Sequence, residues 1–435
     1  MKYRNINNIW NDAKKIIPNG NHLLSKNPDL FLPGKWPAYY RKAKGCFIWD
    51  LNGKKYTDLC LMGVGTNILG YAHTSIDKKV IKSIKESNMC SLNSIEEFLL
   101  SKELIKIHPW FDMVRYARTG AEANAVAIRI SRAFTNKDNV AVCGYHGWHD
   151  WYMAANFKKK TLDSHLFPNL KTRGVVKNLK NTIFSFEYND LEELKKIIKK
   201  KNIGTIFMEV SRSYKPKNNF LKKIREIANK NKIVLIFDEC SSGFRECLGG
   251  LHKKFNVKPD MAMFGKALGN GYAITAVLGT RKIMEKVNDT FISSTFWSER
   301  IGYVAGLAVL KEMKKKEPWK KINKLGKYVK KNWSLIAKRN KLSIEVLGLD
   351  AMPSFVFKDK NHNLFKSYIT QEFLKKNILA SNVIYLSTAH SKKIIDKYLK
   401  ILNLIFKKIK FCKDQNNLNN LVKGKLAQMG MSRLN

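Results

Sequence analysis

The middle of the chain, from about residue 112 to 310, alternates short apolar runs with longer stretches in which apolar residues recur every three or four positions. Short apolar runs predict buried strands, and the wider spacing predicts helices with one apolar face. The expected strands begin near Met113, Val140, Thr182, Gly204, Ile233, Met261 and Ala273. The expected helices begin near Ala121, Leu191, Asn218 and Ser298. This order predicts an α/β fold with a mostly parallel sheet that carries helices on both faces.

The two ends of the chain show a different pattern. Near the start, apolar alternation on both sides of Asn52-Gly53 predicts a β-hairpin. Helical spacing follows at residues 75–87 and 94–108. After a charged break at 314–318, the expected elements are a long helix to about 338, strands at 342–347, 354–357 and 383–386, and helices at 364–375 and 391–410. This mixture predicts a smaller α+β domain.

The composition is that of a globular protein, with 435 residues of which 44% are hydrophobic and 11% aromatic. No apolar run approaches the roughly 18 to 20 residues that a membrane-crossing helix needs. The first residues of the chain lack the continuous apolar core of a signal peptide. We therefore expect a cytoplasmic protein with no membrane partner.

The formal net charge of +45 raises two interpretations. The protein could be a basic binder of nucleic acid or of an anionic surface, built on an inert enzyme fold. Specific readers of nucleic acid, however, use arginine forks and a concentrated patch. Here most of the charge is lysine, and it is spread through nearly every expected helix. That distribution favours solvated helix faces, so a nucleic-acid partner is not expected.

Cysteine and histidine spacings give little support for a disulfide framework or a metal. The seven cysteines are odd in number and contain no Cys-x-x-Cys pair. His146 and His149 lie three residues apart, but only Asp150 stands nearby as a further ligand. We therefore expect free thiols and no metal.

Two polar residues follow directly after buried strands. Asp238 ends the apolar run that starts at Ile233, and Lys266 follows the run Met261 to Phe264. Taken alone, such an aspartate is more often a cap or turn former, whereas burial of Lys266 would lower its pKa and make its amine nucleophilic. Parallel strands present function at their carboxyl ends, so both side chains should reach one edge of the sheet. A cofactor with a ring nitrogen to hold protonated and an aldehyde to trap would need this pair.

The segment Arg118 to Asn124 joins an expected strand to an expected helix through small residues. Backbone N–H groups and the positive end of a helix dipole suit a phosphate, although small residues also open helices for packing reasons. Tyr145 closes the strand that begins near Val140, and its ring could stack on a planar cofactor.

These pieces, in this order, resemble the class III aminotransferase family of fold-type I pyridoxal 5′-phosphate enzymes, and most closely its branch around glutamate-1-semialdehyde 2,1-aminomutase. The resemblance covers about residues 30–410. The matching motifs are Thr119-Gly120-Ala121-Glu122-Ala123, Tyr145-His146-Gly147, Phe237-Asp238-Glu239 with Gly243-Phe244-Arg245, and Gly265-Lys266-Ala267-Leu268-Gly269-Asn270-Gly271.

The resemblance implies which residues make the site. The implied catalytic residues are Lys266, Asp238 and Tyr145. The implied cofactor contacts are Thr119, Gly120, Ala121, Tyr145, His146, Glu209, Asp238, Cys240, Lys266 and Thr295. In the family, the lysine forms the Schiff base and shuttles the proton, and the aspartate holds the pyridine nitrogen.

The other implied contacts surround the ring and the phosphate. By resemblance, Tyr145 stacks on one face of the ring and Cys240 fills the other, while Glu209 lies near the ring hydroxyl. The turn at Thr119 cradles the phosphate. Family members are commonly homodimers with shared active sites, and Thr295 stands where a threonine of the partner subunit completes the phosphate site.

The resemblance also implies a domain plan. Residues 1–74 would hold the hairpin, part of the small domain and a dimer contact. Residues 75–315 would form the large domain that binds pyridoxal phosphate, and 316–435 the small α+β domain.

The function implied is an aminotransferase that moves an amino group from a small-molecule donor to a carbonyl acceptor, a ketone or an aldehyde. The acceptor expected from the resemblance is a sugar or a surface-polymer precursor. The alternative is an aminomutase similar to the glutamate-1-semialdehyde enzyme, in which both half-reactions occur on one substrate. Against the aminomutase, Val210 replaces the usual proline, Arg212 and Ser213 replace an asparagine, and residues 22–40 contain no arginine for the substrate carboxylate.

Overall fold

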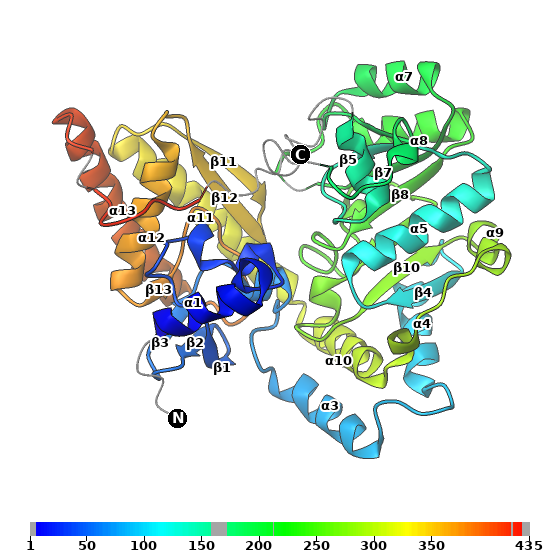
Figure 1. Cartoon of the computed structure of the whole chain (residues 1–435), viewed down its shortest axis with the longest axis horizontal. Coiled ribbons are helices and arrows are strands. Elements are labelled where there is room, and N and C mark those ends of the chain that lie inside the picture. The colour runs from blue at the N-terminus through cyan, green and yellow to red at the C-terminus, as the bar shows by residue number, and fades with distance from the viewer. Residues whose placement is uncertain (1–5, 158–171, 212, 419–420, 429–435) are drawn as a thin grey trace. The chain divides into compact units, whose positions relative to one another are not determined.

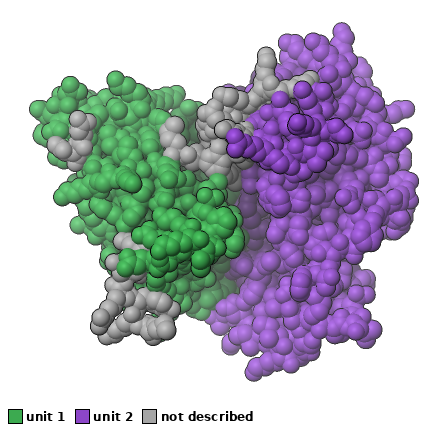
Figure 2. Space-filling view, viewed as in Figure 1, with its two compact units in different colours: residues 1–73, 321–430 green, residues 74–320, 431–435 purple. Residues whose placement is uncertain are grey.

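The computed structural model describes residues 6–157, 172–211, 213–418 and 421–428, so Arg212 lies outside the described residues. The chain folds into two compact units (Figure 2). The first combines described residues of 6–73 with those of 321–428, and the second holds those of 74–320. Within the described residues, no helix is both long and apolar enough to cross a membrane.

The second unit is built on a seven-stranded sheet with the order β4-β10-β9-β8-β7-β5-β6 (Figure 1). Its strands are β4 (Met113–Ala117), β5 (Asn139–Cys143), β6 (Ile183–Ser185), β7 (Ile203–Glu209), β8 (Val234–Glu239), β9 (Met261–Phe264) and β10 (Thr275–Gly279). Five neighbouring strands run parallel, and β10 is antiparallel to both β9 and β4. The α/β class and the mostly parallel sheet are thus confirmed.

Helices of the second unit follow the strands in the expected alternation. They are α3 (Thr74–Glu86), α4 (Ile95–Ile107), α5 (Gly120–Thr135), α6 (Asp150–Met153), α7 (Leu191–Lys200), α8 (Phe220–Lys230), α9 (Arg281–Met284) and α10 (Arg300–Lys316). Two single 3₁₀ turns matter for the site, η7 (Lys266–Leu268) and η9 (Thr295–Ser298). The central strands β7, β8 and β9 are buried along their whole length, which explains their unbroken apolar runs.

The first unit contains two small sheets and five α-helices among its described residues. The sheets join β1 (Tyr40–Lys44), β2 (Phe47–Asp50), β3 (Lys55–Asp58) and β13 (Ile378–Leu379), and separately β11 (Ile344–Leu349) and β12 (Met352–Phe357). The helices are α1 (Ile6–Ile16), α2 (Met62–Gly65), α11 (Pro318–Arg339), α12 (His362–Lys375) and α13 (Lys392–Asp414). The hairpin β2–β3 pairs as its Asn-Gly turn predicts.

One expected strand of the first unit is wrong. Residues 383–386 form no strand, and Val383 makes only an isolated bridge to Ser354. The strand lies a few residues earlier, at Ile378–Leu379, where it pairs in parallel with β3. Because two residues suffice for that pairing, no alternating pattern marks it in the sequence.

Candidate active site

Asp238 lies at the carboxyl end of β8 and is 4% exposed. Its Oδ2 accepts hydrogen bonds from Asn124 Nδ2 at 3.1 Å and from His146 Nδ1 at 2.9 Å. Its Oδ1 accepts from the backbone N–H of Cys240 at 3.0 Å. Because both carboxylate oxygens accept, Nδ1 of His146 must carry the hydrogen.

The environment of Asp238 keeps its side chain ionised. Burial alone would favour the neutral acid, but the interaction with His146, the hydrogen bond from the N–H of Cys240 and the nearby Lys266 together outweigh it. The pKa of Asp238 is therefore lowered from its ordinary value. An ionised carboxylate is the form that can stabilise a protonated ring nitrogen.

Lys266 follows β9, the strand next to β8, and opens η7. Its φ angle of 39° lies in the left-handed region, which a lysine rarely adopts without support from its surroundings. Its Nζ donates a hydrogen bond to the hydroxyl of Ser241, which belongs to the loop after β8. The strand register pairs Asp238 with Met263, so the aspartate and the lysine end neighbouring parallel strands at the same edge.

The turn from Arg118 into α5 carries a capping box. The hydroxyl of Thr119 bonds to Glu122, and the carboxylate of Glu122 accepts from the backbone N–H groups of Arg118 and Thr119. Within the described residues, the backbone N–H groups of Gly120 and Ala121 have no acceptor. The helix therefore presents two N–H donors and its positive dipole end, while the Thr119 side chain is already engaged in the cap.

Tyr145 and Glu209 meet at the ends of β5 and β7. The backbone N–H of Tyr145 donates to Oε2 of Glu209 at 3.1 Å, and Glu209 is 3% exposed. Glu209 pairs with Asp238 in the register of β7 and β8, so the two carboxylates stand side by side along the sheet edge. The neighbouring His146 directs its ring at Asp238 rather than outward.

Cys240 lies between two glycines whose missing side chains leave room for it. A Cβ on Gly120 would come within 3.2 Å of the Cys240 sulfur, and one on Gly265 within 3.4 Å of the same atom. Burial, followed by the charge of Asp238, raises the pKa of the Cys240 thiol well above its ordinary value. The thiol is therefore a neutral, compact wall of the site rather than a nucleophile.

Thr295 is set apart from the other expected site residues. It opens η9, its side chain is exposed, and the backbone beside it is held by Arg118, whose Nε donates to the carbonyl oxygen of Phe296 at 2.8 Å. Within one chain, the structure thus gathers nine of the ten expected cofactor contacts around the ends of β5, β7, β8 and β9 and the start of α5, and it leaves Thr295 on the surface.

Comparison with known proteins assigns the chain to a family. A family model described as aminotransferase class-III matches residues 33–405, most of the chain. The chain belongs to the class III aminotransferase family. The 3-aminobutyryl-CoA aminotransferase of Cloacimonas acidaminovorans is 32% identical over 375 residues, which are 84% of this chain and 86% of that protein. The glutamate-1-semialdehyde 2,1-aminomutase of Methanocaldococcus jannaschii is 30% identical and covers 92% of this chain and 97% of its own.

Solved structures agree with this aminotransferase fold. The FumI protein of Sphingopyxis, solved with pyridoxal phosphate, superposes with a TM-score of 0.84 at 20% identity and covers 94% of this chain and 97% of its own. A glutamate-1-semialdehyde aminomutase of Pseudomonas aeruginosa gives a TM-score of 0.80 at 16% identity, with 93% and 94% covered. The expected fold-type I architecture is confirmed, and pyridoxal phosphate is the cofactor of this aminotransferase.

The donor set of the aminotransferase fits pyridoxal phosphate. Two free N–H groups at the start of α5 suit the phosphate, and a carboxylate with a lowered pKa suits the ring nitrogen. An amine on the adjacent strand end suits the aldehyde. No group of three or more histidine, cysteine or acidic side chains that could hold a metal occurs within the described residues.

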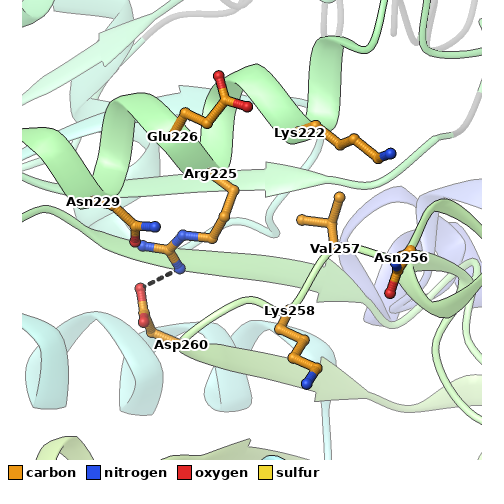
Figure 3. Close-up of a pocket in the computed structure, with 8 residues that line it drawn as sticks. All are labelled: Lys222, Arg225, Glu226, Asn229, Asn256, Val257, Lys258 and Asp260. Carbon is orange, nitrogen blue, oxygen red and sulfur yellow. Dashed lines mark hydrogen bonds and ion pairs between the residues drawn. The ribbon is translucent and has the colours of Figure 1, made fainter.

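A hollow of about 480 Å³ lies at the opposite edge of the same sheet (Figure 3). Arg225 reaches from α8 to Asp260, which stands just before β9, and Lys222 and Lys258 lie at the same hollow. Asp260 also accepts from the N–H of Leu235, at the start of β8. Parallel strands present ligand sites at their carboxyl ends, so this hollow at the amino ends is separate from the cofactor site.

Two residues at the site of the aminotransferase were not predicted from its sequence. Asn124 bonds Asp238 across 114 positions of sequence, and Ser241 accepts from Lys266. Asn124 offered one signal, because it is a polar residue among Ala123, Val126 and Ala127 on the buried side of α5. Ser241 offered none beyond its place three residues after Asp238.

Proposed function

We propose that this class III aminotransferase moves an amino group from a small-molecule amino donor to a ketone or aldehyde, with Lys266 and Asp238 as its central residues. The observation that supports this most directly is the delivery of an amine and an ionised carboxylate to adjacent strand ends. Pyridoxal phosphate, when bound, receives the amino group and delocalises the electrons left by the broken C–H bond.

Lys266 binds the cofactor and moves the proton. Its Nζ lies within reach of the loop after β8, because it already bonds to Ser241. In this role the amine takes a proton from the carbon that bears the donor nitrogen and later returns it at a different carbon. Its strained backbone keeps the side chain aimed at the sheet edge.

The other residues hold and shape the site. Asp238 keeps the ring nitrogen protonated through its ionised carboxylate, and the N–H groups of Gly120 and Ala121 bind the phosphate. Tyr145 and Cys240 enclose the ring from its two faces, and Glu209 lies near the ring hydroxyl. His146 acts on the cofactor through Asp238 rather than by direct contact.

The acceptor is proposed to be an anionic carbonyl compound. The net charge of +45 favours the approach of anions. Two chemical classes fit, a sugar or surface-polymer precursor and an acyl thioester of the kind named for the Cloacimonas relative. Activity assays with sugar precursors and with acyl thioesters, each tested with several amino donors, distinguish the two classes of acceptor.

An aminomutase acting on a single substrate is the second candidate. It is supported by several aminomutase relatives, among them one at 30% identity over 92% of this chain. It is disfavoured by Val210 and by the lack of arginine between residues 22 and 40. Turnover of glutamate-1-semialdehyde without any added amino donor would establish it.

We further propose a homodimer. Large apolar side chains are exposed along α3, α4, the connection between them, and the segment from Phe291 into η9, and they include Ile81, Ile84, Leu92, Ile95, Phe98, Phe291 and Phe296. Asn88 bonds to Glu299 and to the N–H of Ile301, so the α3–α4 connection lies against the end of η9. Such surfaces mark protein contacts, and a second copy would receive Thr295 from this region. Sedimentation of the pure protein tests this proposal.

The cytoplasm is the proposed compartment. All seven cysteines are free thiols, and five of them are buried, namely Cys46, Cys60, Cys143, Cys240 and Cys412. Free thiols are typical of a reducing compartment.

The test is an absorbance spectrum of the purified protein during titration with amino donors. We expect a band in the visible to near-ultraviolet that decreases when a productive donor is added. Lys266→Ala should abolish that band while the protein stays folded, and a variant that retains it would refute the lysine assignment. Tight, salt-sensitive DNA binding with no bound cofactor would instead support the basic binder.

A further inference from the structure

Asn124 ties three elements of the site together. It lies in the second turn of α5, the helix that starts at the proposed phosphate contact, and is 2% exposed. Its Nδ2 donates to the backbone carbonyl of His146 at 2.8 Å and to Oδ2 of Asp238 at 3.1 Å. One amide group therefore connects α5, the turn after β5 and the end of β8.

The orientation of this amide follows from its neighbours. A carbonyl oxygen and a carboxylate oxygen both face it, and neither can donate a hydrogen bond. Turning the amide over would place three acceptors against one another in a buried space. The Asn124 nitrogen must therefore point at Asp238, which leaves Oδ1 of Asn124 without a partner among the described residues.

The two carboxylate oxygens of Asp238 differ in how many hydrogen bonds they accept. A carboxylate oxygen accepts about two hydrogen bonds. Oδ2 already has two N–H donors, Asn124 and His146, whereas Oδ1 has one, the N–H of Cys240, and the Cys240 thiol adds only a weak bond to the carboxylate. Oδ1 is thus the oxygen with an acceptor position to spare within the described part of the chain.

We propose that Asn124 is a positioning residue for the cofactor, because together with His146 it saturates Oδ2 of Asp238 and leaves Oδ1 to receive the protonated ring nitrogen. This inference rests on the proposed function of Asp238. Without Asn124, Oδ2 would regain a free acceptor position and the carboxylate would lose one of the three bonds that fix its rotation. The ring nitrogen would then have two competing acceptors in different orientations.

A merely structural role for Asn124 is the alternative, since it also satisfies the carbonyl of His146. The chain offers a matched control on the same helix. Ser131 is fully buried on α5 and bonds to Thr205 of β7 at 2.6 Å, so it also joins α5 to the sheet without touching Asp238. Ser131→Ala removes a buried polar bond of the same helix–sheet contact.

The experiment compares Asn124→Ala, Asn124→Leu and Ser131→Ala as full-length protein. Leucine fills the space of asparagine but donates nothing, so it separates lost packing from lost hydrogen bonding. For both Asn124 variants we expect the dissociation constant of pyridoxal phosphate to rise about tenfold or more, as loss of a hydrogen bond to a charged group implies. The absorbance band of the bound cofactor should shift, and kcat should fall about tenfold while KM for the donor stays within about twofold.

Ser131→Ala should lower the melting temperature of the cofactor-free protein as much as the Asn124 variants do, with cofactor affinity and absorbance unchanged. The proposal is overturned if Asn124→Leu binds pyridoxal phosphate like the parent, or if Ser131→Ala weakens binding equally. If neither variant folds, Asn124→Ser, whose hydroxyl can reach only one of the two acceptors, makes the same comparison. A parent protein that binds no pyridoxal phosphate would overturn the proposed function itself, whereas normal parent binding with unaffected variants would overturn only the role of Asn124.

Discussion

Two consecutive carboxylates at the end of β8 lie in networks that differ by one hydrogen bond. Asp238 and Glu239 are both buried, and each is paired with a fully buried histidine. Consecutive residues of a strand point to opposite faces of the sheet, so the two networks lie on different sides of β8. Within the described residues, N–H and O–H groups give Asp238 three donors and Glu239 four, and the Cys240 thiol adds a weak bond to Asp238.

The four donors of Glu239 all belong to the chain segment that follows it. They are the hydroxyl of Ser242, the N–H groups of Leu251 and His252, and Nδ1 of His252. Glu239 therefore closes the loop after β8 and has no acceptor position left for a ligand. Asp238 keeps one. The difference is consistent with the proposed roles, in which Asp238 contacts the cofactor and Glu239 stabilises the fold.

The largest effect is expected from Asp238→Asn. The amide keeps the shape of the side chain but loses the charge that would stabilise a protonated ring nitrogen. We expect kcat to fall about a thousandfold, in the range seen when a preorganised charged or polar group is removed from an active site. Steady-state kinetics measures the loss, and unfolding in urea should show only a modest change in stability. A kcat within tenfold of the parent would remove Asp238 from the catalytic residues.

Glu239→Gln should give the reverse result. Here the buried pair with His252 is broken, so the expected cost is about 3 kcal/mol of unfolding free energy. The protein that remains folded should keep kcat within about threefold, because Glu239 has no position free for the cofactor. Urea unfolding and kinetics on the same preparation test both halves. A large loss of kcat at unchanged stability would show that the two carboxylates do not divide their work in this way.

His108 belongs to the Glu239 side of β8 and gives this network a pH dependence. Its Nε2 accepts from the N–H of Gly250 at 2.9 Å. Burial, helped by the nearby His252 and Lys253, lowers the pKa of His108 from 6.5 to about 3, although the hydrogen bond to the carbonyl of Leu104 and the charge of Glu239 oppose this shift. The folded protein thus keeps His108 neutral where the unfolded chain binds a proton, so stability falls as the pH drops from about 6.5 toward 3.

His108→Gln should remove this dependence, because a glutamine can both donate and accept but does not titrate. Below pH 6.5, one proton taken up only by the unfolded chain contributes a slope of about 1.4 kcal/mol per pH unit. We expect the variant to be less stable at pH 7 and to have a flatter stability profile between pH 6.5 and 5. That range lies above the acidic region in which Asp238 and Glu239, with lowered pKa values, lose their own contributions. A variant with an unchanged slope would contradict the assignment.

Local patterns in the sequence were sufficient to predict most of the strands and helices of the second unit. The strands β4 and β9 begin at the predicted Met113 and Met261. β9 is buried along its whole length and is therefore apolar throughout, whereas β4 is only partly buried and includes Arg115. Lys266 and Asp238 were predicted because each lies at the carboxyl end of an apolar run in the sequence. The motif spacing then identified the family.

Contacts between distant segments were not predictable in the same way. β13 pairs with β3 through Ile378 and Thr57, more than 300 positions apart, and only two residues take part. The bond from Asn124 to Asp238 depends on how α5 packs on the sheet, which no local period encodes. The exposure of Thr295 likewise depends on the fold around η9. Sequence patterns give each element its type, whereas these contacts arise only from packing.

The smallest effect is expected at the opposite edge of the sheet, where Arg225 bonds Asp260 at 2.7 Å (Figure 3). In Arg225→Lys, a cation remains near Asp260, and Asp260 still accepts from Leu235. We expect the unfolding free energy to change by less than about 1 kcal/mol, as is usual for accessible ion pairs. Cofactor affinity and kcat should match the parent within about twofold, since the hollow lies at the amino ends of β8 and β9 and the proposed site at their carboxyl ends. A tenfold change in kcat would mean that the amino ends and the carboxyl ends of the strands are energetically coupled. The function of Asp238 would then depend on contacts at the amino ends of the strands.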